Sequence, residues 1–256
     1  MLRYLFIFML LISSYNCKEK EHKSPSPEKL TADAIVKTAI DTMGGIKVDQ
    51  SDISFDFRDL HFRAVRNHGK FHLERQFTDS VPEIKDVLNN SGFERYIGGE
   101  KVSLIDSMIP KYSGSVNSVH YFSILPYGLD GKAVHKTYLD SIEIKGNPYH
   151  KIKVTFSEDG GGEDYEDEYI YWINTNTYTV DYLAYTYKEN TGGQGFRFRE
   201  AYHPRKVNGI RFVDYNNYKP SSSEVNLKNL DSLFMTGQLE EVSKIELKNI
   251  EVKLLN

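Results

Sequence analysis

The feature that most restricts the fold of this chain is a long stretch, residues 137–218, in which short alternating segments are separated by turn signals. The signals fall at residues 146–148, 160–162, 174–176, 190–193 and 208–209. Asn208-Gly209 is the strongest of them, because Asn-Gly satisfies the type I′ turn that joins two antiparallel strands. Turns at these intervals are typical of antiparallel sheet, so the stretch predicts a meander of about six strands.

Aromatic residues are unusually frequent, with 18 Tyr and 14 Phe but a single Trp among 256 residues. Aromatic side chains fit the pleated surface of strands, which favours a sheet protein. The hydrophobic content of 39% and the charged content of 27% are ordinary for a globular protein with a core. A net charge of −4 without a long basic stripe leaves nucleic-acid binding without an electrostatic basis, and no nucleic-acid partner is expected.

Upstream of the meander, the hydrophobic period changes from helical to strand-like. Ser26-Pro27 favours a helix start, apolar residues recur at helical spacing from Leu30 to Met43, and Gly44-Gly45 provides the stop. From Ile53 the period is two, and the turn at residues 67–69 predicts a hairpin. Later elements are a second hairpin over residues 93–105, a short helix with an apolar corner over 115–129, a short helix over 230–236 and a last strand over 242–254.

Two faces are distinguished along the later strands. Tyr169 and Tyr171 share one face of a strand and Ile170 and Trp172 the other, so both faces are expected to be covered or to line a cavity. Further along, Arg197, Arg199 and Ala201 share one face, while Phe196, Phe198 and Tyr202 share the other. The second pattern predicts that the face with the arginines is exposed to solvent.

A sheet of about ten antiparallel strands must curl to hide its apolar face. The expected fold class is therefore mainly β (α+β), a curved antiparallel sheet or half-barrel with an N-terminal helix and one or two short helices. The order of elements, with the segments Tyr169–Asn174 and Val180–Leu183, resembles uncharacterised envelope lipoproteins of the Lol lipoprotein-carrier (LolA/LolB-like) half-barrel superfamily. The resemblance covers residues 28–256, which are expected to form a single domain, and it implies a cavity for a lipid or acyl chain.

The N-terminal residues predict export and lipid attachment. Met1-Leu2-Arg3 precedes an unbroken apolar run from Tyr4 to Ile12, which is too short for a membrane span and matches a secretory signal. Cys17, the only cysteine, follows this run and resembles the lipidated cysteine of bacterial lipoproteins. We therefore expect a signal peptide over residues 1–16, a lipidated Cys17 and a flexible tether over residues 17–27.

The tether also bears on location. Lys18, rather than Asp, follows the cysteine, which resembles lipoproteins sent to the outer membrane. The charged tract that begins there resembles a surface-export signal, although a solvated linker explains it equally well. The expected location is the cell envelope, as an outer membrane lipoprotein that faces the periplasm or the surface, with the membrane as a partner through the lipid. The oligomeric state stays open.

Motifs for catalysis and for metals are absent. The sequence has no Gly-x-Ser-x-Gly elbow, His-Glu-x-x-His, P-loop or Gly-x-Gly-x-x-Gly. An acidic cluster could bind Ca²⁺, but it lacks EF-hand spacing and is interpreted as a solvated loop. Its members are Glu158, Asp159, Glu163, Asp164, Glu166, Asp167 and Glu168. His61 and His72 could form a metal pair, but exposed strand histidines are commoner, and neither a metal nor a cofactor is expected.

The early hairpin and the helical corner are expected to face each other and to line an apolar site. The candidate ligand-binding residues are Phe55, Phe57, Tyr121, Phe122, Leu125 and Tyr127. The expected function is non-catalytic binding of a lipid, an acyl chain or a lipoprotein by a lipid-anchored protein. Two alternatives remain open: an envelope hydrolase whose site combines distant histidine and carboxylate residues, and a scaffold or assembly subunit with a large exposed apolar patch.

Overall fold

The structure, a computed structural model, describes residues 30–78, 80–162, 165–189, 192–222 and 224–255. The chain divides into two units, Met1–Leu30 and Thr31–Asn256, and the fold described below is that of the second unit. The predicted signal peptide, Cys17 and the tether lie outside the described residues. The described helices are all too short or too polar to cross a membrane.

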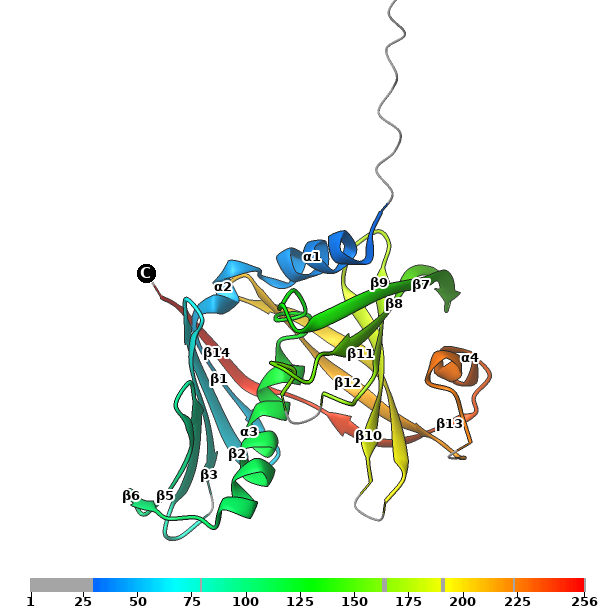
Figure 1. Ribbon diagram of the computed structural model, residues 1–256. Coiled ribbons are helices and arrows are strands. Elements are labelled where there is room, and N and C mark those ends of the chain that lie inside the picture. The colour runs from blue at the N-terminus through cyan, green and yellow to red at the C-terminus, as the bar shows by residue number, and fades with distance from the viewer. Residues whose placement is uncertain (1–29, 79, 163–164, 190–191, 223, 256) are drawn as a thin grey trace, which may run out of the picture. The chain divides into compact units, whose positions relative to one another are not determined.

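Two seven-stranded antiparallel sheets make up most of this unit (Figure 1). Sheet A has the order β14-β1-β2-β3-β4-β5-β6, and sheet B has the order β13-β12-β11-β10-β9-β8-β7. The strands of sheet A are β1 (Gln50–Phe57), β2 (Leu60–Asn67), β3 (Lys70–Phe77), β4 (Ile84–Asn89), β5 (Gly92–Ile97), β6 (Glu100–Val102) and β14 (Lys248–Leu254). Those of sheet B are β7 (Val134–Ile144), β8 (Asn147–Phe156), β9 (Tyr169–Asn174), β10 (Val180–Lys188), β11 (Gln194–Val207), β12 (Ile210–Pro220) and β13 (Leu239–Ile245).

Strands β7 to β12 are the six-stranded meander that the turn signals predict. Between β11 and β12, Asn208 has φ +47° and Gly209 has φ +86°, the two positive values that a type I′ turn requires. The first predicted hairpin is instead three strands, because the chain also turns between Phe57 and Leu60, which face each other in register. Arg58 takes a positive φ of 55° in that turn. No glycine or Asn-Gly pair marks it in the sequence.

The predicted last strand over residues 242–254 is divided into β13 and β14, which belong to different sheets. Leu247 lies at the division, where its N–H donates to Asp214 at 3.0 Å and its carbonyl accepts from Arg205 at 2.7 Å. Arg205 also donates to Asp214 at 2.9 Å. These bonds hold the chain where it passes from the edge of sheet B to the edge of sheet A (red in Figure 1).

Four α-helices among the described residues accompany the sheets: α1 (Ala32–Met43), α2 (Ile46–Asp49), α3 (Ile109–Ser123) and α4 (Leu230–Met235). Helix α1 begins after Thr31, whose side chain accepts from the Ala34 N–H. The helix start predicted at Ser26-Pro27 lies outside the described residues. The predicted stop at Gly44 is confirmed. The second predicted helix also begins earlier than expected, with Pro110 in its first turn.

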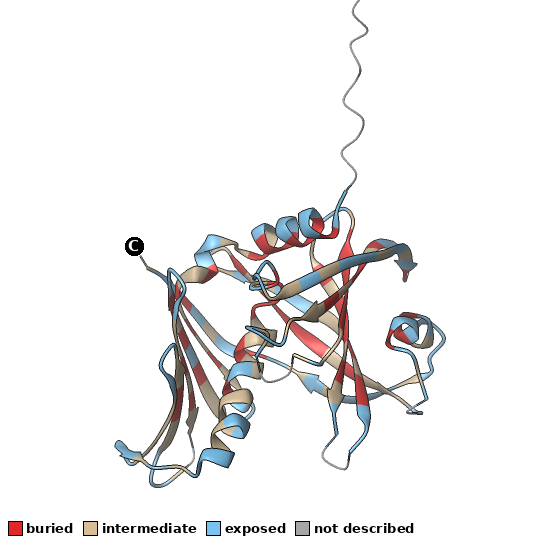
Figure 2. Ribbon diagram, viewed as in Figure 1, coloured by how far each residue is buried: buried red, intermediate tan, exposed pale blue. Residues whose placement is uncertain are grey.

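Sheet B is covered on both faces, as its aromatic pattern predicts. One face packs against α1, with Ile35 and Val36 beside strand residues such as Tyr171. We call this the inner face. On the outer face, Trp172 and Phe198 pack beneath the α4 segment. Figure 2 shows the buried residues running along these strands. The expected fold class is confirmed: a mainly β, α+β fold with two large antiparallel sheets and a few short helices, which fits a curved half-barrel.

Candidate functional site

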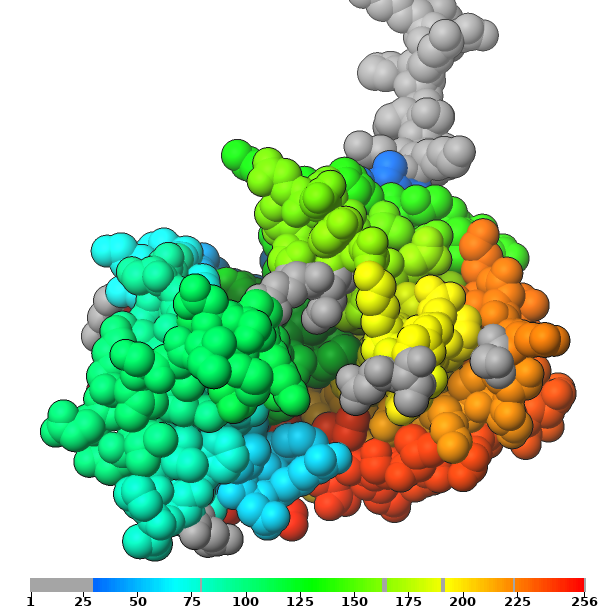
Figure 3. Space-filling model, turned by 60° about the horizontal axis from the view of Figure 1, so that its bottom comes forward, coloured from blue at the N-terminus to red at the C-terminus, as the bar shows by residue number. Residues whose placement is uncertain are grey.

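A cavity of about 700 Å³ lies between α3 and the inner face of sheet B, where the surface is hollowed in Figure 3. This volume falls within the range of about 300–1,000 Å³ that is usual for small-molecule sites. Helix α3, from Ser113 to Ser123, provides one wall. Strands β8 to β12 and the junction of β13 and β14 provide the opposite wall and part of the floor, with Phe57 and Leu88 contributed by sheet A.

Aromatic rings form the sheet wall of the cavity. Tyr169 and Tyr185 face each other across β9 and β10, and their rings stack with centroids 5.4 Å apart. Phe122 of α3 leans onto them, with its centroid 5.2 Å from Tyr185 and 6.4 Å from Tyr169. Phe156 meets the edge of Tyr169 at 5.7 Å. This wall follows from the two-residue period of the strands, which turns alternate aromatic side chains toward the same face.

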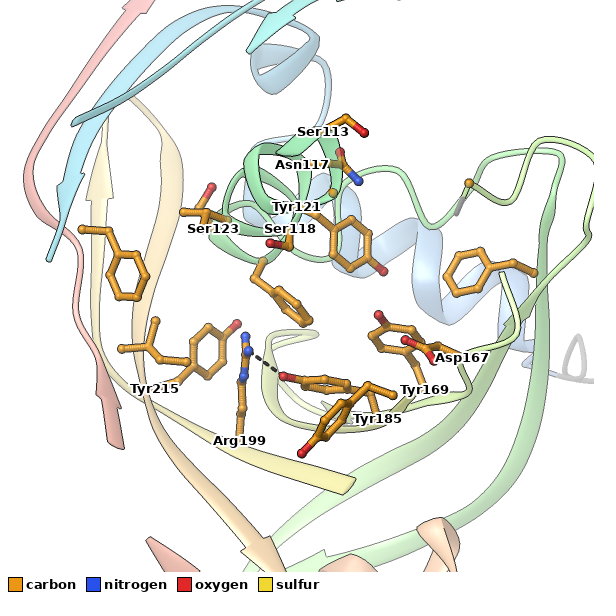
Figure 4. A pocket seen from close by; sticks show the side chains of 18 of the residues that line it. Ser113, Asn117, Ser118, Tyr121, Ser123, Asp167, Tyr169, Tyr185, Arg199 and Tyr215 are labelled. Atoms are coloured by element: carbon orange, nitrogen blue, oxygen red, sulfur yellow. Dashed lines mark hydrogen bonds between the residues drawn. The ribbon is translucent and has the colours of Figure 1, made fainter. Parts of the chain in front are cut away.

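Helix α3 presents small and polar residues to the cavity beside Val119 and Phe122. Ser113, Asn117 and Ser118 recur there at helical spacing, while Val116 and His120 on the other side are buried against sheet A. Tyr121 also points into the cavity (Figure 4). Its hydroxyl lies 3.0 Å from that of Tyr171. The helix therefore supplies hydrogen-bonding groups opposite an aromatic wall.

The buried tyrosines of this region are neutral. Burial raises the pKa of Tyr121 to about 12 and that of Tyr215 to about 12, and it also raises the pKa of Tyr171. Phenols with pKa values this far above neutrality carry no charge at physiological pH, so they add polar atoms without charge. The wall formed by Tyr121 and Tyr215 is suited to a molecule that is largely apolar.

Arg199 is the exception to this uncharged wall. Its side chain comes from β11, is 8% exposed and lines the cavity (Figure 4). The guanidinium carbon lies 3.8 Å from the ring centroid of Phe122, and Nη2 donates to the Tyr185 hydroxyl at 2.8 Å. The prediction that this face of β11 is exposed is wrong at Arg199, because α3 and its Phe122 cover the side chain.

The six predicted ligand-binding residues separate into two groups. Phe57, Tyr121 and Phe122 line the cavity. The other three lie outside the described lining. Phe55 is buried against Phe62 and His120, Leu125 belongs to the core beneath α1, and the Tyr127 hydroxyl donates to Asp49 at 3.0 Å.

Several lining residues are not among the six predicted ligand-binding residues, including Tyr185, Arg199 and Tyr215. Tyr169 also lines the cavity, one of the two possibilities that its strand pattern left open. Alternation along the strands identifies which of them share a face. It does not indicate which face meets α3.

The acidic cluster lies at the edge of the cavity. Glu166 and Asp167 are lining residues, while Glu163 and Asp164 lie outside the described residues. Glu166 forms an ion pair with Lys188, and Glu168 forms one with Lys153 at 2.5 Å. Within the described ranges, no group of three or more His, Cys, Asp and Glu side chains is placed to hold a metal ion.

The two histidines that could have formed a metal pair each lie beside a carboxylate outside the cavity lining. His61 lies 2.7 Å from Asp56, and His72 lies 2.7 Å from Glu74. A hydrolase site in the cavity would require such a pair within the lining, whose described members include Glu166 and Asp167 but no histidine. Binding of a largely apolar molecule is the chemistry that the described lining supports best.

Similar folds are found among solved structures. One is a LolA superfamily protein from Nitrosomonas europaea, with 10% identity, coverage of 89% of this chain and 94% of that chain, and a TM-score of 0.46. A DUF1329 family protein from Desulfovibrio piger has 9% identity, coverage of 84% and 92%, and a TM-score of 0.47. The lipoprotein LppX of Mycobacterium tuberculosis has 11% identity, coverage of 60% and 86%, and a TM-score of 0.27.

Sequence comparison assigns the family. No curated protein matches the chain. The model of a family of unknown function, DUF6503, matches residues 6–247. Because this match spans most of the 256 residues, the chain belongs to the DUF6503 family.

Proposed function

We propose that the protein is a lipid-anchored lipoprotein of the cell envelope that binds a lipid or acyl chain in the cavity between α3 and sheet B. The observation that carries this proposal is a cavity of about 700 Å³ whose sheet wall is aromatic and whose buried tyrosines are neutral. Burial of apolar surface against such a wall stabilises the complex, and the wall imposes few geometric requirements on a flexible chain.

Burial of methylene groups supplies the favourable energy for binding. Each buried methylene contributes about 0.8 kcal/mol, so about ten methylenes between α3 and the aromatic wall contribute about 8 kcal/mol. Ordering the chain and losing its free translation offset part of this gain. Because each further methylene adds about 0.8 kcal/mol, a long acyl chain is a better ligand for this cavity than a short one.

Membrane attachment would come from a lipid on Cys17, which would keep the binding domain close to its source of ligand. The apolar run before Cys17 and the charged tract after it support this part of the proposal, as does the absence of another cysteine. Metabolic labelling of the full chain with an alkyne fatty acid tests it. We expect label on the wild type and none on Cys17→Ser, and an unlabelled wild type would contradict the anchor.

Occupancy of the cavity can be tested by photo-crosslinking on the full chain in membranes. The probe is hexadecanol with a diazirine in its chain, a neutral molecule that tests apolar binding alone. We expect crosslinks to peptides from α3, β9 and β10, since these elements carry the mutually contacting rings of Phe122, Tyr169 and Tyr185 in the lining.

A matched pair of variants on α3 controls this experiment. Ser118 lines the cavity, while Ser115 is exposed on the same helix and does not. Ser118→Trp should fill the space and abolish labelling, whereas Ser115→Trp should leave it unchanged. Equal labelling of the two variants, or crosslinks confined to β5 and β6, would refute binding in this cavity.

A further inference from the structure

We propose that Arg199 binds an anionic head group, so that the ligand is a single-chain amphiphile with an oxyanion at one end. This inference rests on the proposed function, because it specifies the ligand of the same cavity. It starts from the surroundings of the guanidinium, which supply ring faces and a hydroxyl but no carboxylate among the described residues.

The guanidinium is buried without the partners that a buried charge requires. Arginine carries five N–H donors. Among the described residues, the Tyr185 hydroxyl alone accepts from them, at 2.8 Å from Nη2, and Nε is fully buried without an acceptor. A charge that is nine-tenths removed from water is normally paired, because desolvation is otherwise uncompensated. A ligand oxyanion would supply the missing partner.

The other charged residues of the described lining do not fill this role. Glu166 pairs with Lys188, whose side chain is 83% exposed. Two cations belong to this lining. Lys188 is solvated and paired with Glu166, while Arg199 is buried and forms no ion pair with a described carboxylate. An anion that enters the cavity therefore gains most at Arg199.

The position of Arg199 is fixed before any ligand arrives. Its guanidinium stacks on Phe122 at 3.8 Å and lies 5.1 Å from the centroid of Tyr185 and 5.9 Å from that of Tyr215 (Figure 4). The planar fork of arginine matches the geometry of carboxylate and phosphate oxygens. Because the same rings are part of the apolar wall, a molecule held at Arg199 by its head group lies with its chain against aromatic surface.

Competition against the neutral diazirine probe tests the inference on the full chain in membranes. The competitors are hexadecanoate and hexadecyl phosphate, with methyl hexadecanoate and hexadecanol as neutral analogues of the same chain length. We expect the anions to compete about 10- to 100-fold better than the neutral analogues, which is the usual range for a hydrogen bond to a charged group. Preference for either anion supports the proposal, and the better competitor identifies the head group.

Variants of β11 assign the preference to one side chain. Arg199→Met should abolish the discrimination between anionic and neutral competitors while the neutral probe still labels the cavity. Arg197→Met removes the same charge from the same strand and lies outside the lining, so it should keep the discrimination. Arg199→Lys retains the charge without the planar fork and should keep part of it.

The two proposals fail in different ways. If the neutral probe labels the cavity of the wild type but anionic and neutral competitors are equal, the role of Arg199 is refuted and apolar binding stands. If Arg197→Met loses the discrimination as fully as Arg199→Met, the assignment to Arg199 is also refuted. If the neutral probe does not label the cavity at all, the proposed function itself is refuted.

Discussion

Replacement of Asp86 by asparagine should destabilise the protein far more than loss of a comparable ion pair at the surface. Asp86 is fully buried on β4, directly between Arg75 of β3 and Arg95 of β5 in the register of sheet A. It accepts four hydrogen bonds: at 3.1 and 2.5 Å from Arg75, and at 2.6 and 2.9 Å from Arg95. Asp86→Asn keeps the shape of the side chain but leaves two adjacent guanidinium groups without a negative charge.

The magnitude follows from burial. The Arg75 and Arg95 side chains are only 9% and 12% exposed, so water can screen little of the positive charge that Asp86→Asn leaves uncompensated. Removing one partner of a buried ion pair costs about 3–5 kcal/mol. For a domain of this size, about 2–4 °C of melting temperature corresponds to each kcal/mol, so the expected decrease is about 6–20 °C.

Asp52→Asn is the matched control. Asp52 accepts two hydrogen bonds from Arg63 on the same sheet, at 2.9 and 2.8 Å, but the Arg63 side chain is 45% exposed. Exposed pairs contribute about 0.2–1 kcal/mol. Urea unfolding of the full chain gives the free energy of unfolding of each variant. Equal losses for Asp86→Asn and Asp52→Asn, or a loss below about 1 kcal/mol at Asp86, would refute the argument from burial.

Two further predictions concern pH and packing. Burial lowers the pKa of His120 to about 3, below its unfolded value of about 6.5. The free energy of unfolding therefore keeps its full value above about pH 6.5 and decreases as the pH falls from about 6.5 toward 3. Between pH 7 and pH 5, protonation of His120 in the unfolded state should lower the free energy of unfolding of the wild type by about 2 kcal/mol. Urea unfolding at the two pH values should show that His120→Gln does not have this loss. Phe198 is fully buried on the outer face of sheet B, with its ring centroid 4.7 Å from that of Phe234. Phe198→Ala should reduce the free energy of unfolding by about 3–5 kcal/mol but leave labelling of the folded cavity unchanged, and loss of labelling by folded protein would contradict the separation of the two faces.

Locally encoded parts of the fold were predictable from the sequence. Asn208-Gly209 specifies its turn by backbone preference, and Gly44 ends α1 because its φ of 148° is one that residues with a side chain rarely adopt. The short helix expected over residues 230–236 is α4. Each of these features depends on a few neighbouring residues, so a pattern in the sequence is sufficient to locate it.

The division into two sheets depends on contacts between distant residues. Ile53 of β1 pairs with Val252 of β14, and the Asn249 side chain donates to Asp56 at 2.6 Å. The apolar alternation changes phase in this segment, from Ile245 and Leu247 to Ile250, Val252 and Leu254. The phase change alone does not indicate that the two halves belong to different sheets. The register of distant strands follows from the packing of the whole domain.

The same limit applies to the candidate site. Arginine alternating with phenylalanine along β11 indicates a polar face beside an apolar one, and it is the cover supplied by α3 that turns this face into a cavity wall. Phe122 stacks on Arg199 although no local pattern connects the two residues. Phe55 was expected beside Phe57 in the lining, but the contact with His120 of α3 places it in the core.

The position of β14 has a consequence for biosynthesis. The ribosome makes β1 before every other described strand, but the neighbour that covers its free edge is made after all of them. Until residues 248–254 have been translated, β1 exposes unpaired backbone groups that can recruit a strand from another nascent chain. Completion of sheet A therefore waits for the last described strand, which delays its folding until nearly all of the domain has been synthesised.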